Sequence, residues 1–243
     1  MSSTAEKKQS PAVVIMKREL GTYFTSPIAY IVTGLFLLIT GILVFSAFFL
    51  QNRAELRNYF SLLPLLLSFF IPALTMRVYS EDKRIGSIET LMTLPVTETD
   101  VAAGKWLASF ISSLVMIAPT LLYIIPLVIF GRPDMGPVAG GFLGAVFLCA
   151  AFSAIGVFAS SVTKNQIIAF FTAFIICIVL TMIDQFLIFL PAQIVAALAY
   201  ISANAHFTSV SRGIIDTRDL LYFVSVTVFF FYLTVITQQN ERR

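Results

Sequence analysis

The chain has 243 residues, of which 58% are hydrophobic and only 12% are charged, and its mean hydropathy is +0.91. Soluble domains carry about 25% charged residues, and a soluble chain of this length still needs a polar surface. The composition therefore excludes an ordinary water-soluble domain and indicates a membrane protein. The net charge is only +3, so the positions of the basic residues are more informative than their number.

The N-terminal region predicts a short helix at the membrane surface. Residues 1–10 are polar and are expected to be disordered. Within residues 12–25, four apolar side chains recur at helical spacing: Val13, Met16, Leu20 and Phe24. Lys17, Arg18 and Glu19 lie off that line, which suits an interfacial helix with its bases near anionic headgroups. The alternative is an ordinary basic flank of the first span.

Six apolar runs are long enough to cross about 30 Å of hydrocarbon as helices. They are Pro27–Leu50, Tyr59–Met76, Trp106–Phe130, Pro137–Thr163, Gln166–Leu190 and Leu220–Thr237. The runs are uniformly apolar and do not alternate as barrel strands do, so helices are favoured. We therefore predict an all-α integral membrane protein with six transmembrane helices in a single domain, residues 1–243.

The start of the first span carries local signals. Ser26 and Pro27 supply an N-cap and a first-turn proline, so the spanning helix is expected to begin there. Because residues 1–11 are polar and the first apolar run is a full span, we expect an uncleaved anchor and no cleavable signal peptide.

The basic residues predict the orientation of the spans. If six spans alternate from a cytoplasmic N-terminus, the inner segments hold Lys7, Lys8, Lys17, Arg18, Arg77, Lys83, Arg84, Lys105, Lys164, Arg242 and Arg243. The outer loops hold the other bases: Arg53, Arg57, Arg132, Arg212 and Arg218. The positive-inside rule then places both termini and the segment 77–105 in the cytoplasm.

Several spans carry helix-perturbing or small residues. Four prolines interrupt spans and predict kinks: Pro64, Pro72, Pro119 and Pro126. Gly140-x-x-x-Gly144 allows close helix approach, and packing within the subunit is the simpler interpretation. Cys149 and Cys177 each fall inside a predicted span, where they suit apolar packing rather than a disulfide.

The segment Pro191–Asp219 is too short and too apolar for an ordinary outer domain. It ends in a polar patch that includes Arg212, Asp216, Arg218 and Asp219. Two short half-helices re-entering the outer face of the membrane would fit, provided that protein or a cavity surrounds them. A loop lying on the surface fits equally well, and the sequence leaves both interpretations open.

The sequence shows little sign of covalent chemistry. His206 is the single histidine, so no His-rich metal site can be assembled, and its outer-loop position is expected to be incidental. No nucleotide-binding glycine loop, nucleophile elbow or metalloprotease motif is present. Asp184 is the one carboxylate placed well inside a span, which makes it a candidate for the substrate pathway. We expect no enzyme, no metal and no nucleic-acid partner.

The segment Arg77–Lys105 is a polar island between two spans. Glu81 and Asp82 occupy a favourable helix N-terminus, and Ile85, Ile88 and Leu91 follow at helical spacing. Pro95 is expected to close this helix. Thr97 and Asp100 resemble a capping box that starts a second helix, running through Lys105 into the third span. The apolar strip of the first helix could lie on lipid, pack on the subunit or enter a partner's groove.

The island resembles the cytoplasmic loop of ABC-2 type permeases. The residues that carry this resemblance are Thr75–Arg77, Glu81–Arg84, Gly86–Leu91, Leu94–Val96 and Gly104-Lys105. Lys17–Leu20 with Tyr23–Tyr30, and Ser211–Leu220 near the C-terminus, are similar to motifs of the gliding-motility-associated ABC transporter permease family. The resemblance covers nearly the whole chain.

The resemblance implies an ATP-binding cassette exporter subunit without its own ATPase. Two copies of a separate ATPase subunit would carry ATP and Mg²⁺, so this chain would hold no cofactor. The coupling residues implied are Glu81, Asp82, Lys83, Arg84, Gly86, Glu89, Leu91, Leu94 and Pro95. Further expected partners are a second permease copy or a related membrane subunit, and a membrane protein with a large periplasmic part.

Two rival functions stay open at this point. A non-transporting subunit could transmit force from ATP hydrolysis to a periplasmic partner, and the sequence separates this poorly from export. An intramembrane enzyme would need a cluster of polar groups at one depth, and only Asp184 and scattered hydroxyl side chains are available. The substrate does not follow from the sequence.

Overall fold

The computed structural model describes residues 10–51, 56–87, 96–130, 134–186, 200–214 and 216–241, and these ranges form helices and no strands. The helices are α1 Pro11–Thr25, α2 Pro27–Gln51, α3 Arg57–Thr75, α4 Ser80–Ile85, α6 Glu98–Ile117, the 3₁₀ segment η1 Ala118–Tyr123, α7 Ile124–Phe130, α8 Met135–Val162, α9 Gln166–Phe186, α11 Ala203–Ser211 and α12 Thr217–Glu241.

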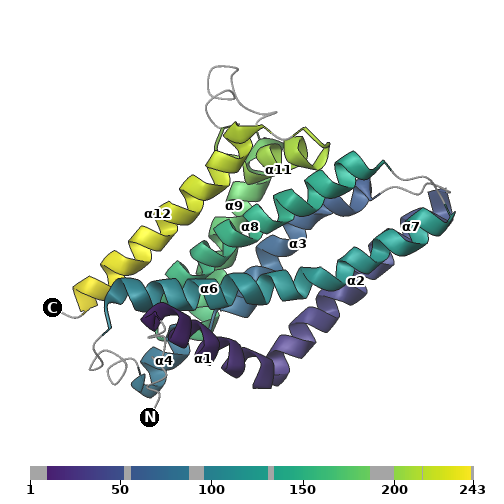
Figure 1. Cartoon of the computed structure of the whole chain (residues 1–243). Helices are drawn as coiled ribbons and strands as arrows, with labels where there is room; N and C mark the ends of the chain where they lie inside the picture. The colour runs from purple at the N-terminus through teal and green to yellow at the C-terminus, as the bar shows by residue number, and fades with distance from the viewer. Residues whose placement is uncertain are drawn as a thin grey trace, which may run out of the picture.

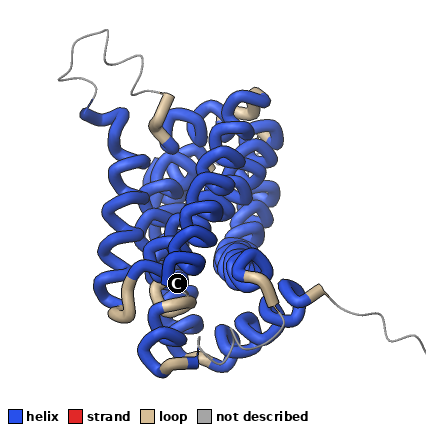
Figure 2. The backbone as a smooth tube through the Cα atoms, turned by 90° about the vertical axis from the view of Figure 1, so that its left-hand side faces the viewer, coloured by secondary structure: helices blue, strands red, loops and turns tan. Residues whose placement is uncertain are grey.

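The predicted class, an all-α membrane protein with six spans, is confirmed. Six stretches of helix within the described residues are long and apolar enough to cross a membrane: α2, α3, α6 with η1 and α7, α8, α9 and α12. They form one bundle whose helices run side by side (Figures 1 and 2). We call its two ends the α1–α4 end, where the first and last described residues, Ser10 and Glu241, also lie, and the α11 end.

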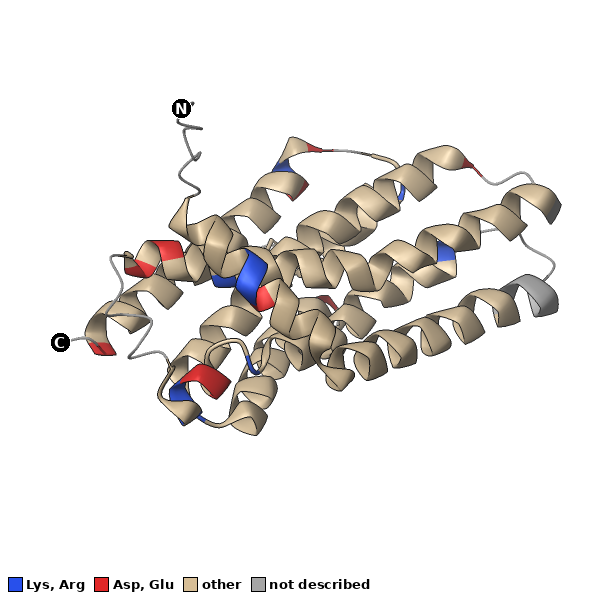
Figure 3. Ribbon diagram, turned by 60° about the horizontal axis from the view of Figure 1, so that its bottom comes forward, with Lys and Arg blue, Asp and Glu red and all other residues tan. Residues whose placement is uncertain are grey.

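Charged residues gather at the ends of the helices and leave their middles apolar. Figure 3 shows much of this charge at the α1–α4 end, around α1, α4 and the C-terminus of α12. The exposed sides of α2, α9 and α12 carry large apolar residues, such as Leu38, Ile175 and Val228. This distribution suits a bundle whose middle is surrounded by hydrocarbon.

Helices α3 and α8 form the centre of the bundle. Of the six apolar stretches, the two built on these helices are the most buried, with 61% and 67% of an 18-residue apolar window inside the protein. Leu67 and Ile71 of α3 join Phe152 and Ile155 of α8 in one hydrophobic core. The other four spans pack around this pair and expose more of their surface.

Local sequence signals decide how the third span begins and bends. Thr97 accepts a hydrogen bond from the Asp100 backbone, and the Asp100 carboxylate accepts one from the Thr97 backbone, so the predicted capping box is confirmed. Helix α6 ends at Ile117, and the chain passes into 3₁₀ geometry where Pro119 removes a backbone donor. Pro64 and Pro72, in contrast, lie inside an uninterrupted α3.

Helix α11 lies in the segment predicted to re-enter the membrane. A Cβ on Gly140 would overlap the Val210 carbonyl oxygen, and one on Gly144 would lie 3.2 Å from the Phe207 ring. The two glycines of α8 therefore allow α11 to approach, which confirms packing within the subunit. Residues 191–199 and 215 of the segment lie outside the described residues, so re-entry stays a prediction.

We predict that Gly156→Ala destabilises the central pair of helices. A Cβ at Gly156 of α8 would overlap Thr75 Oγ1 of α3. Overpacking of this kind costs about 1–3 kcal/mol. The variant should therefore unfold at a lower temperature in detergent, measured by the loss of helical circular dichroism.

The matched control is Gly34→Ala on α2, where a Cβ would meet nothing within 4 Å. This variant should unfold within about 0.5 kcal/mol of the wild type. Equal midpoints for the two alanine variants would contradict the packing of α3 on α8.

Candidate functional site

Helix α1 packs directly against the beginning of α6. A Cβ at Gly104 would lie 2.7 Å from the Ala12 carbonyl oxygen and 2.8 Å from Ile15 Cβ, so a larger residue there would push α1 away. Ile15 is the buried residue of α1. The interface brings Glu19, one turn further along α1, toward Lys105.

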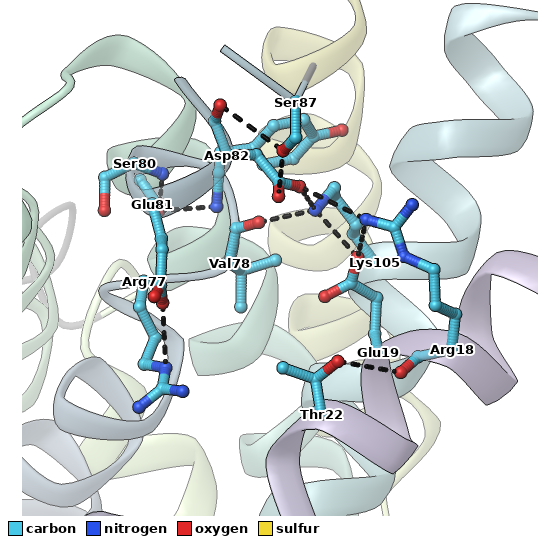
Figure 4. Close-up of polar contacts among 12 residues, drawn as sticks. Arg18, Glu19, Thr22, Arg77, Val78, Ser80, Glu81, Asp82, Ser87 and Lys105 are labelled. Atoms are coloured by element: carbon cyan, nitrogen blue, oxygen red, sulfur yellow. Dashed lines mark hydrogen bonds and ion pairs between the residues drawn. The ribbon is translucent and has the colours of Figure 1, made fainter. Parts of the chain in front are cut away.

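Lys105 is the centre of a polar cluster at the α1–α4 end (Figure 4). We call Arg18, Glu19, Val78, Asp82 and Lys105 the Lys105 cluster. The Lys105 side chain is fully buried. Its Nζ lies 3.0 Å from Glu19 Oε1, 2.5 Å from Asp82 Oδ2 and 2.5 Å from the Val78 carbonyl oxygen. An ammonium group has three N–H donors, so each donor of Lys105 has an acceptor.

The cluster also balances its charges. Arg18 Nη2 lies 3.4 Å from Glu19 Oε1 and 3.8 Å from Asp82 Oδ2. Lys105 Nζ also lies 4.9 Å from the centre of the Tyr79 ring, a favourable place for a cation. Two carboxylates therefore face two cations, and the buried ammonium is compensated.

Asp82 lies in α4, beyond the end of the spanning helix α3. Burial, the largest single influence on its pKa, disfavours the charged carboxylate. Lys105, the hydrogen bond from Ser87 and Arg18 together outweigh burial and hold the pKa of Asp82 below its ordinary value. Ser87 Oγ donates to Asp82 Oδ1 at 2.7 Å. Asp82 is therefore ionised at neutral pH and can pair with Lys105.

The opposite face of α4 is fastened to α8 and α12. Ser160 Oγ of α8 accepts hydrogen bonds from the backbone N–H groups of Tyr79 and Ser80, at 3.0 and 3.1 Å, and donates to the Met76 carbonyl oxygen at 2.9 Å. The nearly buried Lys83 lies 2.5 Å from Glu241 Oε1 of α12 and donates to the Ser161 carbonyl oxygen. One short helix thus contacts α6, α8 and α12.

Helix α4 is shorter than the sequence suggested. The prediction of one helix from Glu81 to Pro95 is wrong at Gly86, which has φ +75° and ends α4 after Ile85. A left-handed residue interrupts the α-helical ladder, and glycine adopts this conformation without a Cβ clash. The predicted coupling residues Glu89, Leu91, Leu94 and Pro95 lie outside the described residues.

The described coupling residues divide into two groups. Asp82 and Lys83 point into the subunit, as shown above. Glu81 is partly exposed and pairs with Arg77 at 3.3 Å, while Arg84, Ile85 and Gly86 are exposed. Ile85 is 65% exposed. The exposed group is thus the part of α4 that a partner could contact.

The α11 end holds a separate set of polar contacts. Asn204 Nδ2 of α11 donates to Asp184 Oδ2 of α9 at 2.7 Å. His206 Nδ1 lies 2.6 Å from Asp219 Oδ1 of α12, and its ring stacks on Tyr222. Asp184 and Asp219 therefore fasten α11 to its neighbours.

The other polar residues predicted at this end do not join those contacts. Asp216 Oδ1 accepts a hydrogen bond from the Arg218 backbone, and Arg212 caps α11. A role for Asp184 in a substrate pathway stays a prediction.

Sequence reasoning missed several of these residues. The sequence places Glu19 off the apolar line of this helix, although it follows Ile15 by four residues and so shares its face. His206 was treated as incidental, yet it pairs with Asp219. Ser160 gave no signal, because a serine in an apolar helix has no motif of its own.

The described parts of the chain contain no group of three or more histidine, cysteine, aspartate or glutamate side chains suited to a metal ion. The arrangement instead defines a polytopic helical membrane protein with a polar junction at one end. Residues 28–237 match the family described as ABC-2 family transporter protein, and the chain belongs to that family. It is the membrane permease component of an ABC transporter. No match was found among curated proteins.

We predict that Lys105→Met destabilises the α1–α4 end. The substitution leaves the Glu19 and Asp82 carboxylates together without the buried cation between them. Breaking a buried ion pair by removing one partner costs about 3–5 kcal/mol. The midpoint of thermal unfolding in detergent at pH 7 should fall accordingly, whereas Arg84→Met, on the exposed side of α4, should change it little.

Two further comparisons test whether the uncompensated carboxylates cause the loss of stability in Lys105→Met. Adding Glu19→Gln and Asp82→Asn to Lys105→Met should recover stability, because the uncompensated charges are gone. Since the folded-state pKa of Asp82 is lowered, its contribution is present above the ordinary carboxyl pKa and is lost as pH falls through the lowered value. The difference between wild type and Lys105→Met should therefore shrink in acid. Equal midpoints at pH 7 would rule out the ion cluster as a stabilising element.

Proposed function

We propose that the chain is the transmembrane half of an ATP-driven exporter, with α4 as the element that receives movement from a separate ATPase. The observation that carries this proposal is the double attachment of α4. Asp82 connects it to Lys105 of α6, while Lys83 connects it to the ends of α8 and α12. A force on the exposed side of α4 would therefore act on three spanning helices.

The cofactor and the partners follow from the same proposal. ATP and Mg²⁺ would bind two ATPase subunits, and this chain would pair with a second copy or a related membrane subunit. A membrane protein with a large periplasmic part is a further partner, as the gliding-associated resemblance implies. The exporter direction and the subfamily are part of this proposal.

The proposed orientation places the α1–α4 end in the cytoplasm of a bacterial inner membrane. Lys17, Arg18, Arg77, Lys83, Arg84 and Lys105 support it, because all belong to helices or turns of this end.

Cysteine labelling tests the orientation. Arg84→Cys and Arg212→Cys should react with a membrane-impermeant maleimide from opposite sides, with Arg84→Cys protected in intact cells. Cys149 and Cys177 are buried and should give little background. Labelling of both introduced cysteines from the same side would contradict the proposed orientation.

Ile85→Asp tests the docking of the ATPase. Ile85 is a large apolar side chain of α4 that is 65% exposed, and a carboxylate there should disrupt a partner's apolar contact. We expect loss of a co-purifying ATPase from the native membrane, measured as nucleotide hydrolysis in the affinity-purified complex. Ile214→Asp is the matched control, since Ile214 is also 65% exposed but lies at the α11 end.

Retention of the ATPase by Ile85→Asp at the level of Ile214→Asp would contradict docking on α4. Loss in both variants would point to a defect in membrane insertion, which the amount of full-length protein in the membrane fraction would reveal.

A further inference from the structure

A cleft of about 370 Å³ lies between α1, α4 and α6, and residues of the Lys105 cluster form part of its lining. This volume falls in the range of small-molecule sites, about 300–1,000 Å³. The charged side chains of its lining are Arg18, Glu19, Arg77, Glu81, Asp82 and Lys105, of which Lys105 is fully buried. Figure 4 shows these side chains at the junction of the helices. The cleft therefore lies at the charged α1–α4 end of the bundle.

The rest of the lining combines apolar side chains with the hydroxyl groups of Thr22, Tyr23, Ser87, Ser109 and Ser112. It continues along α6 from Lys105 to Ser112, about 10 Å at the rise of an α-helix, and includes Leu74 of α3. The hydroxyl groups of Ser109 and Ser112 donate to carbonyl oxygens of their own helix, at 2.9 and 2.8 Å. Their donors are consequently occupied. The charged groups together with the apolar side chains of Leu74 and Ala108 suit a ligand that is polar at one end and apolar at the other.

The lining of the cleft has hydrogen-bond donors to spare. A guanidinium group has five N–H donors. Among the described residues, Arg77 directs one nitrogen to Ser26 Oγ at 2.8 Å and another to Glu81 Oε2 at 3.3 Å. The other donors of Arg77 have no protein acceptor there, although the side chain is only 21% exposed. An acceptor-rich group such as a phosphate would satisfy them.

The charges of the lining select the kind of headgroup. The three bases Arg18, Arg77 and Lys105 are balanced by the three acids Glu19, Glu81 and Asp82. A ligand with net charge would upset this balance, whereas one with a phosphate and an ammonium group preserves it. Lys105 has no donor left, whereas the guanidinium groups of Arg18 and Arg77 have more donors than the described residues occupy. Arg77 is the more enclosed of the two, and its partner Glu81 is partly exposed and can accept from a ligand.

We propose that this cleft binds the headgroup of a zwitterionic phospholipid with a primary ammonium group, as in phosphatidylethanolamine. Arg77 binds the phosphate, Glu81 accepts from the ammonium group, and the glycerol end of the lipid lies along α6. The bound lipid contacts α1, α4 and α6 together and so stabilises their junction. The proposal concerns this chain alone and does not depend on an ATPase partner.

The test uses the full-length, delipidated protein in detergent and native mass spectrometry. Phosphatidylethanolamine should bind about tenfold more tightly than phosphatidylglycerol, which lacks the cation, and more tightly than phosphatidylcholine, which cannot donate a hydrogen bond. Arg77→Gln should weaken phosphatidylethanolamine binding about tenfold. Arg84→Gln, at an exposed position outside the lining, should leave it unchanged.

A second variant separates binding from folding. Thr22 is exposed on α1 and lines the cleft, so Thr22→Phe fills the space without removing a charge. It should abolish the preference for phosphatidylethanolamine while the protein keeps its unfolding temperature in lipid-free detergent. Unchanged binding by Arg77→Gln and Thr22→Phe would overturn the proposal. Equal binding of phosphatidylglycerol would also overturn it, as would binding of soluble glycerophosphoethanolamine as tightly as the lipid.

Discussion

A buried ammonium group fixes the architecture of one end of this protein. Lys105 lies within α6 and is fully buried, so its charge must be compensated inside the protein. Glu19, Asp82 and the Val78 carbonyl oxygen supply the acceptors, and they come from α1, α4 and the turn after α3. The position of α1 and the entry into α4 therefore depend on the same cation, and Gly104 makes the close approach of α1 sterically feasible.

The need to compensate Lys105 ties α4 to the spanning helix α6 in this ABC-2 permease. A helix of six residues has little intrinsic stability, so contacts with other elements hold it in place. Ser160 binds its N-terminal backbone, Lys83 contacts α8 and α12, and Asp82 contacts α6. The element proposed to meet the ATPase is thus fastened to the spans at several points. The cleft beside it offers a site where membrane composition would influence the same junction.

The fold was predictable because long apolar runs decide it. All six spans, the capping box at Thr97 and the opening helix α1 follow from hydropathy and local motifs. The site was less predictable, since its contacts join residues far apart in sequence, such as Glu19 with Lys105. The helix break at Gly86 was missed because an apolar period continues past it. The buried face of α1 differs from the predicted one because the apolar line of Val13, Met16, Leu20 and Phe24 leaves out Ile15 and Glu19.

The central claim is that Lys105 holds α1 and α4 together as one unit. The most direct measurement is the distance between spin labels at Val14→Cys on α1 and Arg84→Cys on α4, both exposed positions, by double electron–electron resonance. Cys149 and Cys177 would be replaced by alanine for this purpose. We predict one narrow distance distribution in the otherwise wild-type chain and a broad one when Lys105→Met is added. An equally narrow distribution in both would contradict the account.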